Sequence, residues 1–571
     1  SPGRWTFLYE TGPLGIAEGG WIFFQAPPFW GWSTPQVTDT ESVGFTEVST
    51  LAEGIVLDAH TVDQGLLGIQ ILERPLEAGE QVRIVYGAGE RGAIADRFAE
   101  SESRFFFAVD GDGDGVRKLV ESRLTVEVLP GPPVQMVVLL PSTAQPGDKV
   151  RLTVAILDAA GSAGVDVEGE IRLQGLDGLP ETVHLEAEQK GLLHLDVYLE
   201  SEGIVRILAE GPQGLVGESN PLVVSSGGHR IAWGDLHGHS ATSDGTGTFA
   251  DYFAYARDVA ALDVVALTDH DHWGMEPLAL HPELWNEMQR QVEEFYLPGE
   301  FVTIFGYEWT SWSQGHRHVL YFESGGEVLS SVDPEYETPE QLWAGLRDSL
   351  ALTFAHHSAG GPIPTNWQYA PDPNLEPVTE IVSVHGSSEA LDSPGVIYSP
   401  LPGNFVRDVL DRGFELGFVG SGDSHDGHPG LSHLASQSGG LAAFLTHDLT
   451  RQGVLDALRA RRVYATNGPR ILLDSRLEGR AMGEKLALCD LKGDGEIPRS
   501  GDLQIVVVAP APLDRVDVIR TGQVHFSVPC DGKRECSFTK SLENLEAGEY
   551  VYARAVQIDG GAAWSSPNYL R

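Results

Sequence analysis

Short alternating apolar segments fill the first part of the chain. The runs GWIFFQ, VRIVYG and SRFFFAV are separated by turns rich in Gly and Pro, and such runs between turn signals are typical of β-strands. From residue 131 the runs VQMVVLL, KVRLTVAIL and GIVRILAE recur at the spacing of an immunoglobulin-like sandwich. The sequence therefore predicts a β-rich domain over residues 1–130 and an immunoglobulin-like domain over 131–228.

The pattern changes at residue 229. A strand-like IAWGDLH precedes the helical FADYFAYARDVAALD and the strand-like DVVALTDH, and this alternation is typical of a parallel α/β sheet or barrel. Five more strand candidates follow, namely FVTIFGYE, HVLYF, LTFAHH, EIVSVHG and GFVGSGDSH. Alternating strands return after residue 470. We expect an α/β domain over 229–470 and a C-terminal β-sandwich over 471–571, so the fold class is multidomain α/β plus all-β.

Size and composition fit several globular domains. At 571 residues the chain exceeds the size at which a single core keeps growing, and 42% hydrophobic residues are enough for large cores. The 82 acidic and 38 basic residues give a formal net charge of -44, which would repel nucleic acid and anionic membranes. We expect a small-molecule ester as the partner, with neither nucleic acid nor membrane, and leave the oligomeric state open.

The cysteines and the first residues bear on cellular location. Cys530 and Cys536 bracket the turn-like DGKRE and could close a hairpin as a disulfide or stay reduced. The chain begins Ser-Pro-Gly without an initiator methionine, so a targeting segment could have been removed. A periplasmic or extracellular location is favoured over the cytoplasm, without being decided. Cys489 is expected to be a buried small hydrophobe.

Ionisable residues stand at the ends of most strands expected in 229–470. His237 and His239 are two residues apart, so on a strand both imidazoles face the same side. Strand ends of α/β barrels meet at one face, where active sites are built. The expected metal ligands are His237, His239, Asp244, His270, Glu308, His316, His318, His356, Asp423 and His425.

Burying so many polar groups would be unfavourable unless cations satisfied them. Imidazole and carboxylate without thiolate suit zinc, manganese or iron, and the set could hold two or three divalent ions with Glu308 as a bridge. Such ions convert a bridging water into a hydroxide nucleophile and polarise a P=O or C=O group. Glu308 and Asp423 are the expected catalytic centre. Arg317, His357 and His385 are candidates for supporting or oxyanion contacts, with a surface role equally open.

In this order, the motifs HxHSxxSDG, TDH, a strand-end Glu, an AHH histidine and GSGDSH resemble the PHP (polymerase and histidinol phosphatase) superfamily over residues 229–470. The flanking β domains, the LTRQGVLDALRARRVYATNGPR helix and the terminal AWSSP look like its carbaryl hydrolase-like branch. The resemblance implies a distorted seven-stranded (β/α) barrel with a multinuclear metal centre.

The resemblance also implies three ion sites. It favours His316 over His318 and His356 over His357, and leaves His318 and His357 to substrate or supporting contacts. The implied sites are His237, His239, Glu308 and Asp423 for the first ion, Glu308, His316 and His356 for the second, and Asp244, His270 and His425 for the third.

The expected function is hydrolysis of a phosphomonoester or phosphodiester by a metal-bridging hydroxide. Two alternatives stay open. One is a carbamate or carboxylic ester hydrolase of the carbaryl hydrolase type, which Trp273, Trp309, Trp312 and Trp367 favour because they place apolar surface near the metal motifs. The other is a catalytically inactive binding protein with a degenerate barrel.

A second metal motif lies in the N-terminal domain. The segment DGDGDGVRKLVE matches the EF-hand calcium loop at Asp110, Asp112, Asp114, Gly115 and Glu121. Both flanks are strand-like, so a plain turn is the competing interpretation. Calcium is a hypothesis at this loop.

Overall fold

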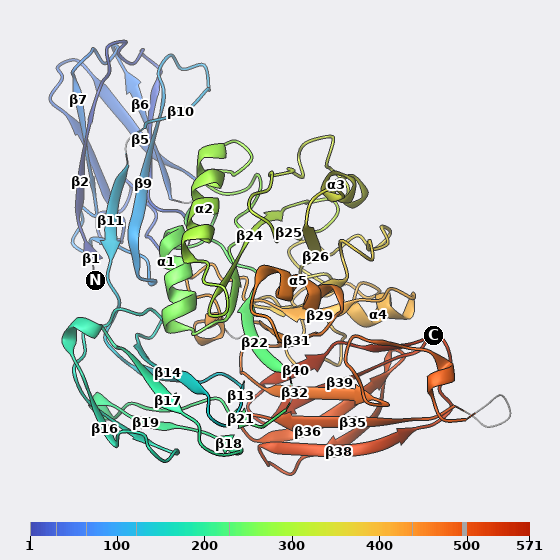
Figure 1. Cartoon of the computed structure of the whole chain (residues 1–571). Coiled ribbons are helices and arrows are strands. Elements are labelled where there is room, and N and C mark those ends of the chain that lie inside the picture. The colour runs from blue at the N-terminus through green and yellow to red at the C-terminus, as the bar shows by residue number, and fades with distance from the viewer. Residues whose placement is uncertain are drawn as a thin grey trace. The chain divides into compact units, whose positions relative to one another are not determined.

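The structure is a computed structural model that describes residues 2–29, 31–63, 65–121, 123–227, 229–436, 438–493 and 499–571. The chain divides into two compact units, which Figure 1 shows coloured along the chain. The first unit comprises Ser1–Pro130 with Thr246–Thr248, and the second comprises Gly131–Gly245 with Phe249–Arg571. The domain boundaries expected after residues 228 and 470 lie inside the second unit and stay predictions.

The first unit consists of antiparallel strands around an aromatic core. The rings of Phe7 and Phe24 lie 5.0 Å apart, and those of Phe24 and Phe107 lie 5.2 Å apart. A three-stranded sheet has the order β2 (Trp5–Glu10), β7 (Gln81–Tyr86), β4 (Thr46–Thr50), and β1 (Pro2–Gly3) pairs with β8 (Ala93–Ile94). The larger sheet has the order β10 (Lys118–Leu119), β9 (Glu100–Asp110), β3 (Trp21–Gln25), β6 (Leu66–Leu72), β5 (Val56–Asp63), with β11 (Leu124–Val128) on β9.

The second unit begins with short, mostly antiparallel sheets that enclose a core of aliphatic residues. Leu152 and Val154 of one sheet and Ile171 of another are fully buried in this core, because alternate side chains of each strand face inward. One sheet is β12 (Gln135–Leu139), β14 (Lys149–Leu157), β17 (Leu192–Tyr198), another is β16 (Thr182–Leu185), β15 (Gly169–Gln174), β19 (Leu208–Glu210), β20 (Val216–Glu218), and a third is β13 (Thr143–Ala144), β21 (Leu222–Val224), β18 (Gly203–Val205).

A long mixed sheet follows, flanked by helices. Its strands β23 to β27 are buried along their whole length, which explains their continuous apolar runs. The strands are β22 (Arg230–Asp235), β23 (Val264–Ala266), β24 (Val302–Trp309), β25 (Arg317–Tyr321), β26 (Ala351–Ala355), β27 (Val378–Ser383), β28 (Gly386–Ser387), β29 (Gly417–Gly420), β30 (Leu441–Thr446) and β31 (Val463–Thr466). The helices are α1 (Phe249–Ala254), α2 (Pro282–Phe295), α3 (Pro339–Leu346), α4 (Val406–Asp411) and α5 (Arg451–Arg459).

The pairing of these strands does not show the closed seven-stranded (β/α) barrel that the resemblance implies. β25 runs antiparallel to both β24 and β26, whereas β22 to β24 are parallel. Only residues 310–316 connect β24 to β25, and a parallel crossover needs roughly a dozen residues or more. Among the described strands β29 pairs with β27 alone, and β22 continues the sheet through β30 and β31. Backbone pairing among the described strands therefore does not close this sheet into a barrel.

The C-terminal strands form a further sheet and also extend the central one. Because β31 pairs with β40, the sheet continues from Tyr464 opposite Ser565 into the C-terminal region. The extension consists of β40 (Ala562–Ser565), β39 (Tyr550–Gln557), β36 (Leu513–Arg520) and β37 (Gln523–Pro529), with β41 (Asn568–Leu570) and β34 (Lys485–Leu486) beside it. The separate sheet is β33 (Arg480–Ala481), β32 (Leu472–Leu477), β35 (Gly501–Val508), β38 (Glu535–Leu542).

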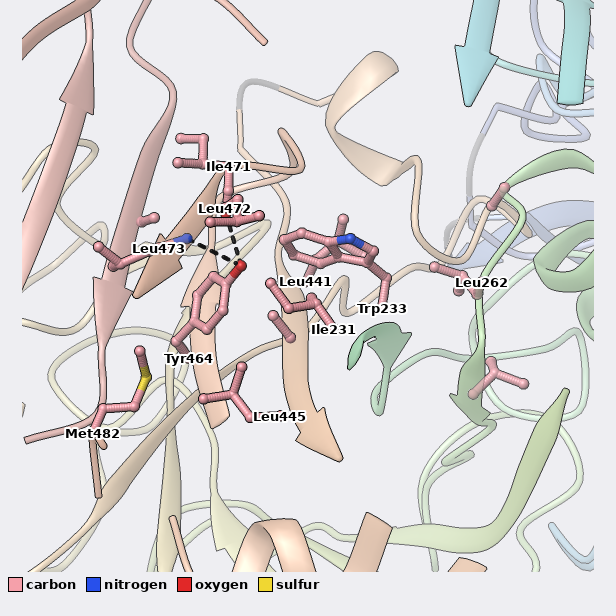
Figure 2. Close-up of a cluster of buried hydrophobic side chains, with 14 of the residues drawn as sticks. Ile231, Trp233, Leu262, Leu441, Leu445, Tyr464, Ile471, Leu472, Leu473 and Met482 are labelled. Atoms are coloured by element: carbon pink, nitrogen blue, oxygen red, sulfur yellow. Dashed lines mark hydrogen bonds between the residues drawn. The ribbon is translucent and has the colours of Figure 1, made fainter. Parts of the chain in front are cut away.

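A hydrophobic cluster joins these parts of the second unit (Figure 2). Trp233 of β22 and Tyr464 of β31 are fully buried in it. The Tyr464 hydroxyl donates to the Ile471 carbonyl at 2.9 Å and accepts from the Leu473 amide at 3.4 Å. The Trp233 indole N–H donates to the Ser142 hydroxyl at 2.9 Å. Residues that the sequence assigns to three domains thus share one core.

A buried ionic network links α4 to β39 and β40. Glu389 is fully buried and accepts hydrogen bonds from Arg407 at 2.8 Å and Arg554 at 2.9 Å. The Tyr552 hydroxyl donates at 2.6 Å and the Trp564 indole N–H at 2.8 Å. Donors on α4, β39 and β40 therefore satisfy both oxygens of this carboxylate.

The cysteines contradict the expected burial of Cys489 and show no disulfide between Cys530 and Cys536. Cys489 is exposed, so its expected burial is wrong: it lies in a short 3-10 turn, Leu488–Asp490, rather than in a strand. Cys530 and Cys536 are free thiols. Burial, together with the neighbouring Cys536, raises the pKa of Cys530 to about 12. None of the described helices is long and apolar enough to cross a lipid bilayer.

Candidate metal centre

The ends of the central strands bring ionisable side chains to one region. β25 contributes because it runs in the opposite direction: its start lies beside the end of β24, with His318 opposite Glu308 and Arg317 opposite Trp309. Neighbouring residues of a strand face opposite sides, so Arg317 points away from the side of His318. The strands supply His237 and His239 after β22, His270 after β23, Glu308 in β24, His316 and His318 at β25, His356 and His357 after β26, Glu380 and His385 in and after β27, and Asp423 and His425 after β29.

One group of four matches the first implied ion site. His237 Nε2 lies 3.1 Å from Asp423 Oδ1, 3.4 Å from Glu308 Oε2 and 3.2 Å from His239 Nε2. His239 Nε2 lies 3.4 Å from both carboxylates. Ligands about 2.1 Å from a common ion are separated by roughly 3.0–3.4 Å. The ligand atoms of His237, His239 and Glu308 lie close enough together to hold one divalent ion, and Asp423 lies within 3.4 Å of both histidines.

A second group lies at the more exposed side. Asp244 Oδ1 is 3.3 Å from His270 Nε2 and 3.3 Å from His425 Nε2, and His239 Nδ1 lies 3.9 Å from the same oxygen. These ligand atoms lie close enough together to hold an ion. The structure therefore brings together the residues of the third implied site and adds His239 to them.

The remaining implied site is not gathered as a set. His316 Nδ1 contacts Glu308 Oε1 at 2.7 Å, but the rings of His316 and His356 are 6.5 Å apart. His356 instead groups with His385 and Asp423, whose Oδ2 lies 2.7 Å from His385 Nε2 and 3.4 Å from His356 Nε2. A second ion held by this group would have His385 and Asp423 as ligands in place of the Glu308 and His316 of the implied site.

Unpartnered nitrogens show that these residues fit metal ions. Neither ring nitrogen of His318 has a hydrogen-bond partner among the described residues, and the side chain is fully buried. His316 Nε2 and His357 Nδ1 are buried without hydrogen-bond partners in the same way. A buried, unsatisfied polar atom costs about 1–3 kcal/mol. Imidazole lone pairs that no proton donor reaches are suitable ligands for borderline divalent ions.

The histidines keep the central carboxylates ionised. Burial alone would raise the pKa of Glu308, but His270 and His316 hold it well below its usual range. Burial likewise opposes ionisation of Asp423, and His237 is the leading neighbour that lowers its pKa well below normal. Every ion pair that described residues make with these two carboxylates is with a histidine. Among the described residues, these carboxylates therefore have histidines as counter-ions and neither Lys nor Arg.

Buried acids hold the ligand-bearing loops in place. Asp235 accepts from the amides of Gly422 at 2.7 Å and Gly430 at 2.9 Å, and burial raises its pKa to about 7. A side chain on Gly422 would place its Cβ 2.4 Å from the Asp235 carboxylate, so only glycine fits before Asp423. Asp423 itself adopts a left-handed φ of 52°, a strained conformation for a non-glycine residue that often marks functional sites.

Two ionisable side chains at the ends of these strands occupy other roles. Arg317 is fully buried and donates through Nε to Glu376 at 3.0 Å, so it is not in the cluster. Asp269, also at a strand end, accepts from the Ser240 amide at 2.8 Å and hydroxyl at 2.7 Å. His357 does lie at the centre, with Nε2 3.3 Å from His316 Nδ1. It is buried, so it reaches the ligands rather than the surface.

Glu380 is the residue that the sequence analysis missed. It lies 3.0 Å from His237 Nδ1 and 2.6 Å from His356 Nδ1, and it is almost fully buried. Its sequence signal is a glutamate inside the wholly buried strand VTEIVS, because an acid is rarely buried in an apolar strand without a partner.

Aromatic side chains are exposed beside the histidines. Trp273 and Trp312 are 43% and 46% exposed, and their rings lie 5.6 Å apart. Trp312 also lies 5.2 Å from the His316 ring, and Tyr398 lies 5.4 Å from the His385 ring. Trp309 and Trp367 are buried in the core and do not contribute to this surface.

The acidic loop of the first unit has the geometry of a turn. Asp110 Oδ1 accepts from the Gly113 amide at 2.8 Å and Oδ2 from the Gly115 amide at 2.9 Å. Asp110, Asp112 and Asp114 can bring one oxygen each close together, but strands β9 and β10 flank the loop instead of helices. Calcium at this loop stays a prediction.

Comparisons with known proteins give similarity over most of the chain but no established activity. Residues 250–359 and 429–477 match the family described as a protein of unknown function, DUF3604. This match spans less than half of the chain and includes Glu308, His316 and His356 but neither His237 nor Asp423. The chain is 24% identical to an uncharacterized protein of Chlamydia pneumoniae, over 99% of this chain and 96% of that protein.

Two further similarities have the same character. An uncharacterized protein of Chlamydia trachomatis is 23% identical over 87% of this chain and 84% of its own length. A solved two-domain protein of Bacteroides vulgatus, described as containing a predicted PHP-like metal-dependent phosphoesterase, is 14% identical. It covers 59% of this chain and 95% of its own, with a TM-score of 0.31. This TM-score is too low to establish a shared fold, so the metal centre is inferred from the distances within this protein alone.

Proposed function

We propose that this protein is a metal-dependent hydrolase that cleaves phosphoesters. The observation that carries the proposal is the buried set of His237, His239, Glu308 and Asp423, in which the Nε2 atom of each histidine lies 3.1–3.4 Å from both carboxylates. The motif order that resembles the PHP superfamily supports the same reaction class. Zinc, manganese or iron would suit this oxygen and nitrogen donor set.

Two groups of residues would each hold an ion, and a third group could hold another. The first is His237, His239, Glu308 and Asp423, and the second is Asp244 with His270 and His425. The third is His356, His385 and Asp423. When bound, such ions polarise the scissile group and lower the pKa of water to the range of neutral solution.

The protein's own residues would determine how a substrate approaches. The side chains of His237, His239 and Glu308 are 0–1% exposed, whereas those of His425 and His385 are 17% and 22% exposed. The inner residues are thus shielded from bulk water, and the outer histidines are the ones that a substrate would reach. A ring N–H group of His385 could donate to its oxygens, which stabilises negative charge as it develops.

The test is metal analysis combined with a panel of ester substrates. The full chain is purified, loaded with Mn²⁺ or Zn²⁺, and assayed with an aryl phosphomonoester, an aryl phosphodiester, an aryl carbamate and an aryl carboxylate. We expect bound divalent metal and turnover of a phosphoester, and we expect Asp423→Ala to lose both. A wild-type chain without metal after loading would overturn the proposal, as would undiminished turnover in Asp423→Ala.

A matched control distinguishes loss of metal from loss of folding. Asp158 is also a buried aspartate of the second unit, but it accepts from the backbone amides of Gly131, Ala160 and Ser162 and contacts no imidazole. Asp158→Ala should keep the metal content and turnover of the wild type. Bound metal without turnover of any ester would instead support the inactive binding protein considered as an alternative.

A carbamate or carboxylic ester hydrolase is the second candidate, favoured by the exposed pair of Trp273 and Trp312. Apolar surface beside a metal centre suits an aryl leaving group. If such an ester is the substrate, Trp312→Ala should raise KM roughly tenfold for the aryl ester and leave kcat nearly unchanged, since stacking is worth about 1–1.5 kcal/mol. An equal effect on an ester with a small alkyl group would contradict this role.

A further inference from the structure

Glu380 lies behind the metal centre and contacts two histidines from different strands. Its Oε2 is 3.0 Å from His237 Nδ1, and its Oε1 is 2.6 Å from His356 Nδ1. Strand register explains the arrangement: Ala355 of β26 pairs with Thr379 of β27, so the next residues along, His356 and Glu380, are neighbours. His237 comes to the same carboxylate from the end of β22.

Both contacts have the partners and the lengths of N–H···O hydrogen bonds, 3.0 Å to His237 and 2.6 Å to His356. A carboxylate accepts but does not donate, so each Nδ1 must carry its proton toward Glu380. Nε2 is then the nitrogen of each ring that is left to bind a metal ion.

Both Nε2 atoms face the central carboxylates. His237 Nε2 lies 3.1 Å from Asp423 Oδ1, and His356 Nε2 lies 3.4 Å from Asp423 Oδ2. The other side of this arrangement is closed, because the His318 ring lies 3.8 Å from the His237 ring and is fully buried. Water is thereby kept from competing for the Glu380 oxygens.

We propose that Glu380 is a positioning residue that fixes the tautomer and orientation of both His237 and His356 for metal binding. One carboxylate serves two ligands, so its two oxygens couple the end of β22 to the end of β26. Carboxylate partners of this kind orient metal-bound histidines and make them more basic, and their loss typically costs 10–100-fold in metal affinity. The inference rests on the metal centre of the proposed function.

Glutamine is an informative substitution at this position. Its amide has one oxygen that accepts and one NH₂ group that donates. In Glu380→Gln one histidine can keep its Nδ1 proton, whereas the other must present a lone pair to the NH₂ group and carry its proton on Nε2. That proton would occupy the ligand position of the second histidine.

The experiment measures metal affinity and histidine tautomers in three chains: wild type, Glu380→Gln and Glu376→Gln. Glu376 is the matched control, because it is as buried as Glu380 and lies just before β27, but contacts Arg317 and Thr353 rather than a histidine. Titration with Zn²⁺ or Mn²⁺ is expected to show 10–100-fold weaker binding in Glu380→Gln alone. Glu376→Gln should bind as the wild type does.

Nitrogen-15 spectra of labelled histidines give the readout that a merely structural role would not change. In the wild type we expect both rings to be protonated on Nδ1 before metal is added, and in Glu380→Gln we expect one to carry its proton on Nε2. Wild-type tautomers and affinity in Glu380→Gln would overturn the proposal. Failure of the wild type to bind metal would instead overturn the proposed function, while the tautomers would still test Glu380.

Discussion

Two clusters of buried charge in the second unit solve the same problem differently. Around Glu389 the partners are arginines, a tyrosine and a tryptophan, each of which brings a proton to a carboxylate oxygen. Around Glu308 and Asp423 the partners are imidazoles. His316 among them, and the nearby His318 and His357, have ring nitrogens that no described donor or acceptor satisfies. The first cluster is complete without any added group, whereas the second has nitrogens left to bind cations.

The difference separates a structural network from a functional one. Arginine stays protonated at any physiological pH, so its charge cannot be exchanged for that of an ion. Histidine can give up its proton, and metal binding therefore replaces a proton with a cation at the same atom. Burial and ion pairs alone would not distinguish the two clusters. The identity of the cationic partner does.

The largest expected effect comes from exchanging glutamate for glutamine in each cluster. Glu308→Gln should lower turnover by about 1000-fold, because loss of the ions removes several kcal/mol of transition-state stabilisation. Its bound metal should be lost as well. Glu389→Gln should keep its metal content and lose stability. Metal analysis of both variants, with urea unfolding to follow stability, would contradict the comparison if both lost metal or both kept it.

Removing an arginine from the structural network should destabilise the second unit strongly. Arg554 donates to Glu389 and to Asp517 at 2.9 Å each and is almost fully buried. Arg554→Met leaves both acids short of a partner, which should cost about 3–5 kcal/mol in unfolding free energy. The more exposed Arg515, which also pairs with Asp517, is the control: Arg515→Met should cost at most about 1 kcal/mol.

The pH dependence of stability should carry the signature of Glu389. Burial opposes its ionisation, but Arg554 and Arg407 lower its pKa from 4.5 to about 2. A lowered pKa means that the contribution is complete above pH 4.5 and is lost as the pH falls toward 2, by about 3 kcal/mol in all. The difference in unfolding free energy between wild type and Glu389→Gln should shrink over this range. A constant difference would show that Glu389 is not held ionised.

The smallest expected effect is stabilisation by the ions themselves. Zn²⁺ or Mn²⁺ at 100 times its dissociation constant should raise the free energy of unfolding by about 2.7 kcal/mol, since the ion binds the folded state only. Thermal unfolding with metal and with chelator measures the effect, and Glu308→Gln should lack it. Equal stabilisation of Glu308→Gln would place the binding site elsewhere.

Much of the metal centre could be predicted from residues that stand at strand ends. His237 with His239 and Asp423 with His425 are near in sequence and follow directly after buried strands, so one strand end brings both members of each pair to the same edge of the sheet. The period of two residues in a strand predicted β-strands on both sides of the central region. These inferences depend on local geometry alone, which the amino-acid sequence carries directly.

Other features were decided only by the tertiary structure. The reversed direction of β25, the open central sheet and the pairing of Arg317 with Glu376 depend on which strands become neighbours. Glu380 was missed for the same reason, because its partners His237 and His356 lie 143 and 24 residues away in the chain. By itself the sequence determined which side chains could bind metal and at which strand ends most of them lie. Register between strands decided which of them meet, because pairing depends on contacts that no local pattern records.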